Sequence, residues 1–371
     1  MPDYNRIKMM DLPLEYQTHK GEIDAAMQAV LQRGDFIKGE SVKQFEKAFA
    51  NYLGVSNVVS CGNGTDALQL ALMALGIGEN DEVILPAFSY VAAIEAVSLL
   101  KAKPVLVDVD MKYFQIDTDN LKQKITSQTK AIIAVHLFGQ CADIDVLADI
   151  AKQHHLYLIE DCAQSIGTTY SGKHLGTFGA IACTSFFPTK NLSCYGDGGA
   201  LYTNDDDLAK KVRMLAAHGQ SEKYRHHIVG VNSRLDSLHA ALLNVKLNYL
   251  EKYLARKKEI VTLYKEQLDS LQDIQLPLIY RTVNHSWHQF TILVQHGKRD
   301  ELRKYLKDHG IDSMVYYPLV LNQQEAYKHI VGYCPNSDSL IDKVLSLPIQ
   351  PYLKNHEVSY ICEIIHEFYG G

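Results

Sequence analysis

The stretch at residues 184–204 contains a lysine in an unusual setting for an amine. Lys190 lies between an apolar, β-like run and a cluster of glycines, in a segment with few charges for a surface loop. Burial lowers the pKa of a lysine amine and makes its neutral, nucleophilic form available. Lys190 is therefore the first candidate for a catalytic residue. The alternative is an ordinary surface lysine, and only the surrounding residues can decide between the two.

A glycine-containing turn at residues 60–67 (Ser-Cys-Gly-Asn-Gly-Thr-Asp-Ala) leads from a predicted strand into a predicted helix. Glycines let a ligand approach the backbone, and the free N–H groups at the start of a helix favour a phosphate. The turn lacks the lysine of a Walker A loop and the spacing of a dinucleotide fingerprint. Taken alone, it fits a tight turn with an N-cap at least as well as a phosphate site.

Two further turns carry side chains that suit an aromatic, positively charged ring. Tyr90 follows the strand at residues 82–85 and could lie beside a flat cofactor, although most aromatic residues at strand ends belong to the core. Asp161 ends an apolar run, and its burial is costly unless a cation or a strong donor meets it. A protonated pyridine nitrogen is such a cation, whereas an N-cap for a following helix is the competing interpretation.

Together these features match the needs of one cofactor, pyridoxal phosphate (PLP). This cofactor requires an amine for its aldehyde, an acid for its ring nitrogen, an aromatic side chain for its ring face and a turn that binds its phosphate. No single motif is decisive. Their order along one predicted sheet favours the joint interpretation over each separate alternative.

The elements that must position these residues alternate between short apolar strands and helices. After two helices, at residues 21–34 and 41–53, the predicted strands and intervening helices are: strands at 57–60, 82–85, 104–109, 130–135 and 156–160; helices at 65–75, 91–100 and 143–154. Apolar strands separated by helices predict an α/β fold with a parallel sheet covered on both faces. Ligands of such sheets bind beyond the carboxyl ends of the strands, where the three turns lie.

The pattern changes near residue 255, which divides a large PLP-binding domain (1–255) from a small C-terminal α+β domain (256–371). A long helix is predicted from Leu235 to beyond Tyr249, followed by a charged stretch at residues 256–259. The predicted elements of the small domain are a strand at 290–294, a helix at 299–309, a strand near 314–317 and two further helices.

Composition excludes several classes of partner. The chain has 371 residues and a net charge of −6, which gives no reason to expect nucleic acid or an acidic membrane as a partner. The sequence shows neither a signal peptide nor a membrane-spanning run, so a cytoplasmic protein is expected. Seven cysteines without CxxC spacing argue against disulfides and structural zinc. His218, His226 and His227 have no carboxylate at ligand spacing, so no metal is expected.

The sequence resembles the sugar aminotransferases of the DegT/DnrJ/EryC1/StrS family along nearly its whole length. The motifs that carry the resemblance, in family order, are residues 34–39 (Gly-Asp-Phe-Ile-Lys-Gly), 63–66 (Asn-Gly-Thr-Asp), 159–164 (Ile-Glu-Asp-Cys-Ala-Gln), 185–192 (Ser-Phe-Phe-Pro-Thr-Lys-Asn-Leu), 196–200 (Gly-Asp-Gly-Gly-Ala) and 230–236 (Gly-Val-Asn-Ser-Arg-Leu-Asp). The resemblance implies the fold type I architecture of aspartate aminotransferase, a mostly parallel central sheet with helices on both faces. It also implies a homodimer with shared active sites.

The resemblance assigns a role to each candidate residue. Lys190 would form the Schiff base with PLP and carry a proton between the α-carbon of the donor and the C4' atom of the cofactor. Asp161 would pair with the ring nitrogen, Gln164 would bind the ring's 3-oxygen and Tyr90 would stack on the ring. The phosphate would be held by Ser185, Thr65, Asp66, the Gly64 backbone and, from the neighbouring subunit, Asn232. The alternative for Asn232 is a residue near a helix N-cap.

Within the family, the likeness is greatest to enzymes that aminate UDP-2-acetamido-2-deoxy-3-keto-glucuronate during surface-polysaccharide synthesis. Arg234 would bind the substrate carboxylate, because a guanidinium matches a carboxylate bidentately. His218, Tyr316 and Tyr317 would line the sugar pocket. Tyr316 departs from the pattern, since histidine is expected there, and His239 stands where glutamine is usual.

The expected reaction is a ping-pong transfer of an amino group from L-glutamate to a keto group of a nucleotide-linked sugar. A UDP- or dTDP-linked 3-keto or 4-keto-6-deoxy sugar is the alternative acceptor. Two other classes remain open. A sugar dehydratase of this fold would carry histidine in place of Lys190, and a non-catalytic regulator would have lost part of the cofactor-facing set, which is complete here.

Overall fold

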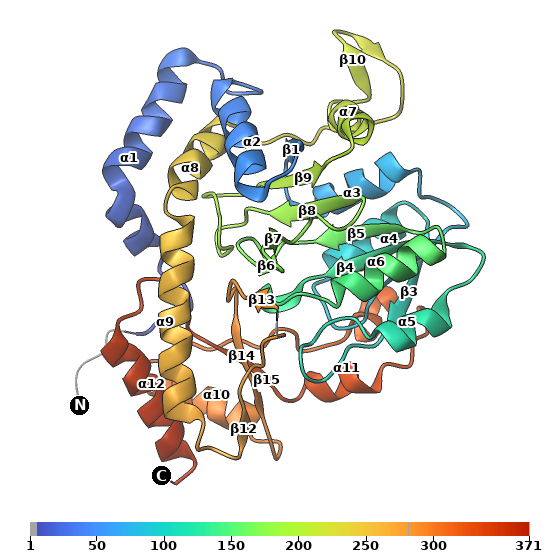
Figure 1. Cartoon of the computed structure of the whole chain (residues 1–371). Coiled ribbons are helices and arrows are strands. Elements are labelled where there is room, and N and C mark those ends of the chain that lie inside the picture. Colours follow the sequence, from blue (N-terminus) through green and yellow to red (C-terminus); the bar gives the residue numbers. More distant parts are fainter. Residues whose placement is uncertain (1–5, 281, 371) are drawn as a thin grey trace.

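A seven-stranded sheet forms the centre of the computed structural model, which describes residues 6–280 and 282–370 (Figure 1). In spatial order its strands are β1 (Asn57–Cys61), β9 (Gly199–Thr203), β8 (Ile181–Ser185), β5 (Tyr157–Asp161), β4 (Thr129–Val135), β2 (Glu82–Pro86) and β3 (Lys103–Val107). Strand β9 pairs antiparallel with β1 and β8, and the other pairings in this sheet are parallel. The predicted, mostly parallel sheet is confirmed.

Helices cover both faces of this sheet. Successive strand residues alternate between the faces, so that Val83 and Leu85 contribute to one core and Ile84 to the other. On the first face lie α3 (Gly64–Leu75), α4 (Ala92–Leu99) and α7 (Asp206–Leu215). On the second face lie α2 (Glu40–Leu53), α5 (Thr118–Lys124), α6 (Ile144–Gln153) and α8 (Ser237–Leu247). Burial on both faces explains why the strands read as continuous apolar runs.

The first helix begins earlier than predicted. Helix α1 spans Leu12–Arg33, whereas the sequence pattern indicated a start at residue 21. The side chain of Asp11 caps it by accepting the N–H of Leu14 at 3.2 Å, and Pro13 lies in the first turn, where its missing N–H costs no bond. The expected stop of the second helix is confirmed, because Gly54 adopts the left-handed conformation with φ of 72°.

The long helix predicted from Leu235 is in fact two helices. Helix α8 starts only at Ser237, and after Leu247 the N–H groups of Asn248 and Tyr249 bond three residues back, which ends the α-helical ladder. Helix α9 (Leu250–Leu268) then runs down the side of the molecule toward the C-terminal helix (Figure 1).

The domain boundary proposed at residue 255 lies inside α9. Leu250 and Leu254 belong to a core of the large sheet, whereas Ile260 and Tyr264 belong to a separate core. This change of core along one helix supports the proposed boundary.

The separate core that includes Ile260 and Tyr264 surrounds a three-stranded sheet. This sheet consists of β12 (Ile274–Gln275), β14 (Phe290–Val294) and β15 (Val344–Leu347), and the helices α10 (Arg299–Asp308) and α12 (Asn355–Phe368) pack against the same core. The prediction of a strand near residues 314–317 is wrong. Met314 forms only an isolated bridge to Ser346, and the chain then leaves the sheet. Pro318, which follows, has no N–H to donate to a neighbouring strand.

The remaining elements are short. They are β6 (Thr169–Tyr170), β7 (Lys173–His174), β10 (Gln220–Glu222), β11 (Arg225–His226), β13 (Val283–Asn284), α11 (Pro335–Leu340) and the 3-10 turns η1 (Leu137–Gly139), η2 (Leu321–Gln323) and η3 (Glu325–Tyr327). Over the described ranges, each helix falls short of the length or apolar character needed to span a bilayer.

Candidate active site

The turns after β1 and β8 touch one another at the carboxyl edge of the sheet. Helix α3 starts directly after β1, and its N-cap Asn63 accepts the N–H of Asp66 at 2.8 Å. A Cβ atom on Gly64 would lie 2.8 Å from the Cβ of Ser185, so that only glycine lets the two turns approach this closely. Two of the predicted phosphate ligands are therefore neighbours, and the first-turn N–H groups of α3 have no partner within the helix.

Ser233, which the sequence analysis did not single out, holds this turn in place. Its hydroxyl accepts the N–H of Gly62 at 2.9 Å and donates to Oδ2 of Asp66 at 2.6 Å. Both the carboxylate and the N–H of Asp66 are thus engaged within the turn, which gives Asp66 a part in shaping it. Ser233 lies in the motif at residues 230–236, which is the signal that could have found it.

Lys190 lies five residues beyond the end of β8, in a turn closed by its N–H bonding the Phe187 carbonyl at 2.9 Å. Its side chain is partly exposed, yet desolvation lowers the pKa of the amine to about 8, and the negative charge of Asp161 opposes this shift. A substantial fraction of the amine is therefore neutral near neutral pH. This is the property that the sequence analysis expected of a catalytic lysine.

Asp161 ends β5 and is buried, with 8% of its surface exposed. Its Oδ1 accepts the N–H of Ala163 at 3.0 Å, and burial raises the pKa of the carboxyl against the influence of Ala163, Lys190 and His136. The alternative of an N-cap is wrong, because a turn and then β6 follow Asp161 instead of a helix. A buried carboxylate with this limited support is suited to bind a cationic N–H of a ligand.

Gln164 joins the turn after β5 to the C-terminal half of the chain. Its Oε1 accepts the N–H of Phe138 at 2.9 Å, and its Nε2 donates to the Tyr317 hydroxyl at 2.9 Å. The ring centroid of Tyr90 lies 6.0 Å from that of Tyr317, and Tyr90 is 56% exposed. Burial raises the pKa of the Tyr317 hydroxyl, which keeps it protonated. The structure thus brings Tyr90, Gln164 and Tyr317 together, with Tyr316 stacked edge-on against Tyr317.

The other expected ligands lie in the segment from 217 to 234. Asn232 is exposed and forms a bridge with Ala217. His218 is exposed, and its carbonyl accepts a hydrogen bond from Nδ1 of His226 at 2.8 Å. Arg234 lines a cavity of about 270 Å³ that Lys190 does not line. Within one chain, Arg234 is therefore placed in a different cavity from Lys190.

One buried cluster has the donor types of a metal site. Donor atoms of His136, Glu160 and Cys162 lie within 4.8 Å of one another. Nε2 of His136 bonds Oε2 of Glu160 at 3.0 Å, while Nδ1 of His136 accepts the Ala142 N–H at 3.1 Å. The Glu160 carboxylate also accepts three backbone N–H groups, those of Gly176, Phe178 and Gly179. These bonds already occupy both ring nitrogens and both carboxylate oxygens, so the cluster is explained as a structural network.

The residues at the carboxyl edge fit PLP. The paired turns at Gly64 and Ser185 offer a cradle for its phosphate, which a Cβ on Gly64 would fill. The buried carboxylate of Asp161 suits the ring nitrogen, and the amine of Lys190, with its lowered pKa, suits the aldehyde.

Known proteins resemble this chain over nearly its full length. The profile described as "DegT/DnrJ/EryC1/StrS aminotransferase family" matches residues 17–366. UDP-2-acetamido-2-deoxy-3-oxo-D-glucuronate aminotransferase of Pseudomonas aeruginosa is 43% identical over 96% of this chain and 98% of its own. A "pleiotropic regulatory protein" of Geobacillus stearothermophilus is 42% identical over 98% of both chains. The crystal structure of NtdA from Bacillus subtilis with bound cofactor PMP matches with a TM-score of 0.94 and 31% identity, over 100% of this chain and 86% of the other.

Proposed function

Because the chain belongs to the DegT/DnrJ/EryC1/StrS aminotransferase family, we propose that this PLP-dependent aminotransferase aminates the 3-keto group of a UDP-N-acetyl-hexuronate. L-Glutamate is the proposed donor, and surface-polysaccharide synthesis is the proposed setting. The family match confirms the predicted enzyme class, and the likeness to NtdA confirms the fold type. The observation that carries the acceptor is the 43% identity, over 96% of this chain, to the aminotransferase of Pseudomonas aeruginosa.

The proposed roles follow from the chemistry of the site. Bound PLP supplies an electron sink and a carrier for the amino group. The Nζ atom of Lys190, with a pKa of about 8, is suited to take a proton from the α-carbon of the donor and to return it later. The carboxylate of Asp161 would hold the ring nitrogen in its protonated form. Gln164 is fixed at both ends of its amide, which would let it orient the bound ring.

A homodimer is part of the proposal, because two expected ligands, Asn232 and His218, lie in an exposed segment. Large apolar side chains near the predicted motifs are also exposed, including Phe36 at 46%, Phe187 at 48% and Val229 at 90%. A second copy of the chain would cover such surface. If Asn232 serves the neighbouring site, mixing inactive Lys190→Ala and Asn232→Ala proteins should restore about a quarter of the wild-type activity, since half of the subunits pair as heterodimers with one intact site each. Mixtures that stay inactive would refute the shared site.

Arg234 is the proposed ligand of the substrate carboxylate. It shares its cavity with Lys38, Lys43 and Arg213, and of these four cations Arg213 already pairs with Glu46 at 2.8 Å. We expect Arg234→Met to raise the KM for a 3-keto uronate about tenfold or more while leaving the KM for a neutral 3-keto-6-deoxy sugar within about twofold.

A panel of 3-keto and 4-keto UDP- and dTDP-sugars, with and without a C6 carboxylate, tests the acceptor through formation of 2-oxoglutarate from glutamate. Turnover of only the sugars without a carboxylate would refute both the uronate and the role of Arg234. The same panel addresses a regulatory role, which the name of the Geobacillus relative raises. A purified protein that is yellow with PLP and turns over a ketosugar supports the enzyme. Fractionation of the producing cells tests the proposed cytoplasmic location.

A further inference from the structure

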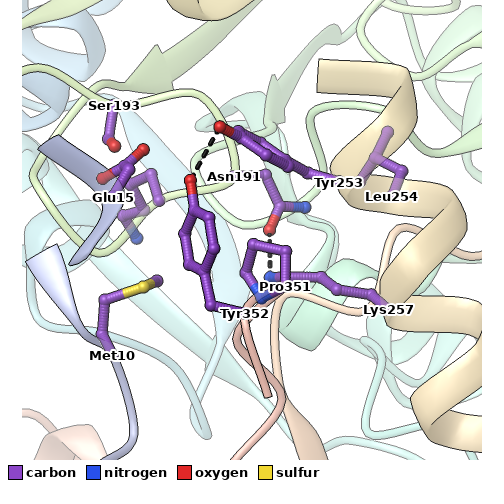
Figure 2. Close-up of a pocket in the computed structure, with 10 residues that line it drawn as sticks. Met10, Glu15, Asn191, Ser193, Tyr253, Leu254, Lys257, Pro351 and Tyr352 are labelled. Carbon is purple, nitrogen blue, oxygen red and sulfur yellow. Dashed lines mark hydrogen bonds between the residues drawn. The ribbon is translucent and has the colours of Figure 1, made fainter. Parts of the chain in front are cut away.

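Two buried lysines hold the loop that follows Lys190. Lys246 on α8 donates from Nζ to the Ser193 hydroxyl at 2.6 Å, and Lys257 on α9 donates to Oδ1 of Asn191 at 2.8 Å. Both lysines are only 3% exposed. Figure 2 shows Lys257 extending from the helix toward the Asn191 amide. The loop is thus fixed by buried amines on two successive helices.

The two lysines differ in how their charge is balanced. Lys246 also pairs with Oε1 of Glu15 at 2.6 Å, so it has a carboxylate partner. The second contact of Lys257 is the carbonyl of Trp287 at 3.3 Å, so both of its hydrogen-bond partners within the described ranges are neutral oxygens. Burial accordingly lowers the pKa of Lys257 to about 7, with the charge of Glu15 opposing the shift. A buried amine held by neutral acceptors alone is costly, and an apolar side chain would fill the space at less cost.

Asn191 connects Lys257 to the turn that follows β5 and to Ser286. Besides accepting from Lys257, its Nδ2 donates to the carbonyls of Ile166 and Ser286, both at 3.2 Å. Ile166 lies two residues beyond Gln164, and Asn191 directly follows Lys190. With its oxygen taken by Lys257, the amide can point its nitrogen only toward these two carbonyls. The loop of Lys190 is therefore locked to the turn that carries Asp161 and Gln164.

A small cavity is lined by both Lys190 and Lys257. It measures about 20 Å³, enough for about one water molecule, and its lining includes Lys190, Asn191 and Lys257. The other titratable groups that line it are Glu15, Tyr253 and Tyr352. The hydroxyl of Tyr352 donates a hydrogen bond to the hydroxyl of Tyr253 at 2.7 Å (Figure 2). Burial lowers the pKa of His288, and the nearby charges of Lys190 and Lys257 lower it further; its Nδ1 is buried and has no hydrogen-bond partner among the residues that the structure describes.

We propose that Lys257 is a positioning residue for Lys190, which acts by fixing the Asn191 amide and thereby the backbone of the lysine turn. The inference rests on the proposed role of Lys190. It requires no particular sugar, because positioning of the lysine affects every step in which that amine takes part.

The test replaces Lys257 by methionine in the holoenzyme, which removes the amine and keeps the length of the side chain. We expect kcat of the glutamate half-reaction to fall about tenfold with KM within about twofold, because positioning affects the reacting state more than binding. The pH midpoint of the absorbance change of the bound cofactor should also shift by about half a pH unit or more. The matched control is Lys258→Met, which makes the same substitution at an exposed position of α9. This control should keep the wild-type midpoint.

A second variant keeps the test decisive if Lys257→Met does not fold. Asn191→Ala leaves Lys257 in place and should reproduce the lowered kcat and the shifted midpoint. The double variant should be no worse than either single one, because both changes remove the same link. Additive losses, or a wild-type midpoint and kcat in both single variants, would overturn the proposal. The half-reaction and the absorbance need no acceptor sugar, so these outcomes are distinct from a failure of the proposed sugar substrate.

Discussion

Replacement of Asp161 by asparagine should lower the pKa of the Lys190 amine in the cofactor-free protein. Desolvation brings this pKa from 10.5 to about 8, and the carboxylate of Asp161 is the charge that opposes the shift. Asparagine is similar in size and keeps an oxygen to accept the Ala163 N–H, which lies 3.0 Å from Oδ1. The substitution therefore removes the charge while leaving the turn intact.

The size of the effect follows from the two protonation equilibria. At pH 7 an amine with a pKa of 10.5 is neutral in about 0.03% of molecules, whereas a pKa of about 8 gives about 9%. Loss of a nearby opposite charge changes a pKa by about one unit, so the pKa of the Lys190 amine should be about 7 in the variant. The neutral fraction at pH 7 should then rise about fivefold, to roughly half of the molecules.

Competitive labelling with acetic anhydride measures this fraction, because the reagent reacts with neutral amines. The cofactor is first removed, the protein is labelled between about pH 6 and about pH 10, and the Lys190 peptide is quantified by mass spectrometry. The exposed Lys47 provides an internal reference in each sample. A wild-type midpoint near 10.5 would refute the desolvation argument. An upward shift in Asp161→Asn would refute the assigned sign of the interaction.

Two further predictions test the cradle and the support behind it. Gly64→Ala should weaken PLP binding about tenfold or more, because its Cβ would lie 2.8 Å from that of Ser185 and force the two turns apart. Gly21→Ala, whose Cβ would meet nothing within 4 Å, is the matched control and should leave PLP affinity unchanged in an equilibrium titration. Lys246→Met should destabilise the protein by about 3–5 kcal/mol, because it leaves the buried Glu15 unpaired. Adding Glu15→Gln should recover most of the lost free energy of unfolding, as measured by denaturant unfolding. A double variant as unstable as Lys246→Met alone would contradict the ion-pair explanation.

The sequence predicted the sheet well because its strands are buried on both faces. Runs such as residues 130–135 carry apolar side chains on both sides, so their burial needs no knowledge of the partners. The break between α8 and α9 could not be predicted in this way. The apolar spacing continues through Asn248, and the 3-10 bonds that end α8 depend on where α9 packs in the small domain.

The candidate site likewise contains residues whose position could be predicted from the sequence and residues whose position could not. Asp161 and Ser185 end two neighbouring strands of the sheet, and Lys190 follows five residues after Ser185, so strand order alone brings them to one edge of the sheet. The contact between Gln164 and Tyr317 joins residues 153 positions apart, and sequence pattern gives no distance between them. Tyr317 entered the predicted site only through family resemblance, and the structure supplies the hydrogen bond that explains its place.

Lys257 shows why a charged stretch is a poor guide to exposure. The run at residues 256–259 was interpreted only as charged, yet Leu250, Leu254, Lys257, Val261 and Tyr264 recur at intervals of three or four along α9, and each is buried. A lysine within an apolar helical stripe is the same anomaly as Lys190 beside an apolar strand. In both cases burial removes the amine from water and lowers its pKa. The two anomalies meet at Asn191, which follows one lysine in sequence and bonds the other in space. Periodicity therefore contained a signal for Lys257, but only the structure shows that this lysine contacts the loop that follows Lys190.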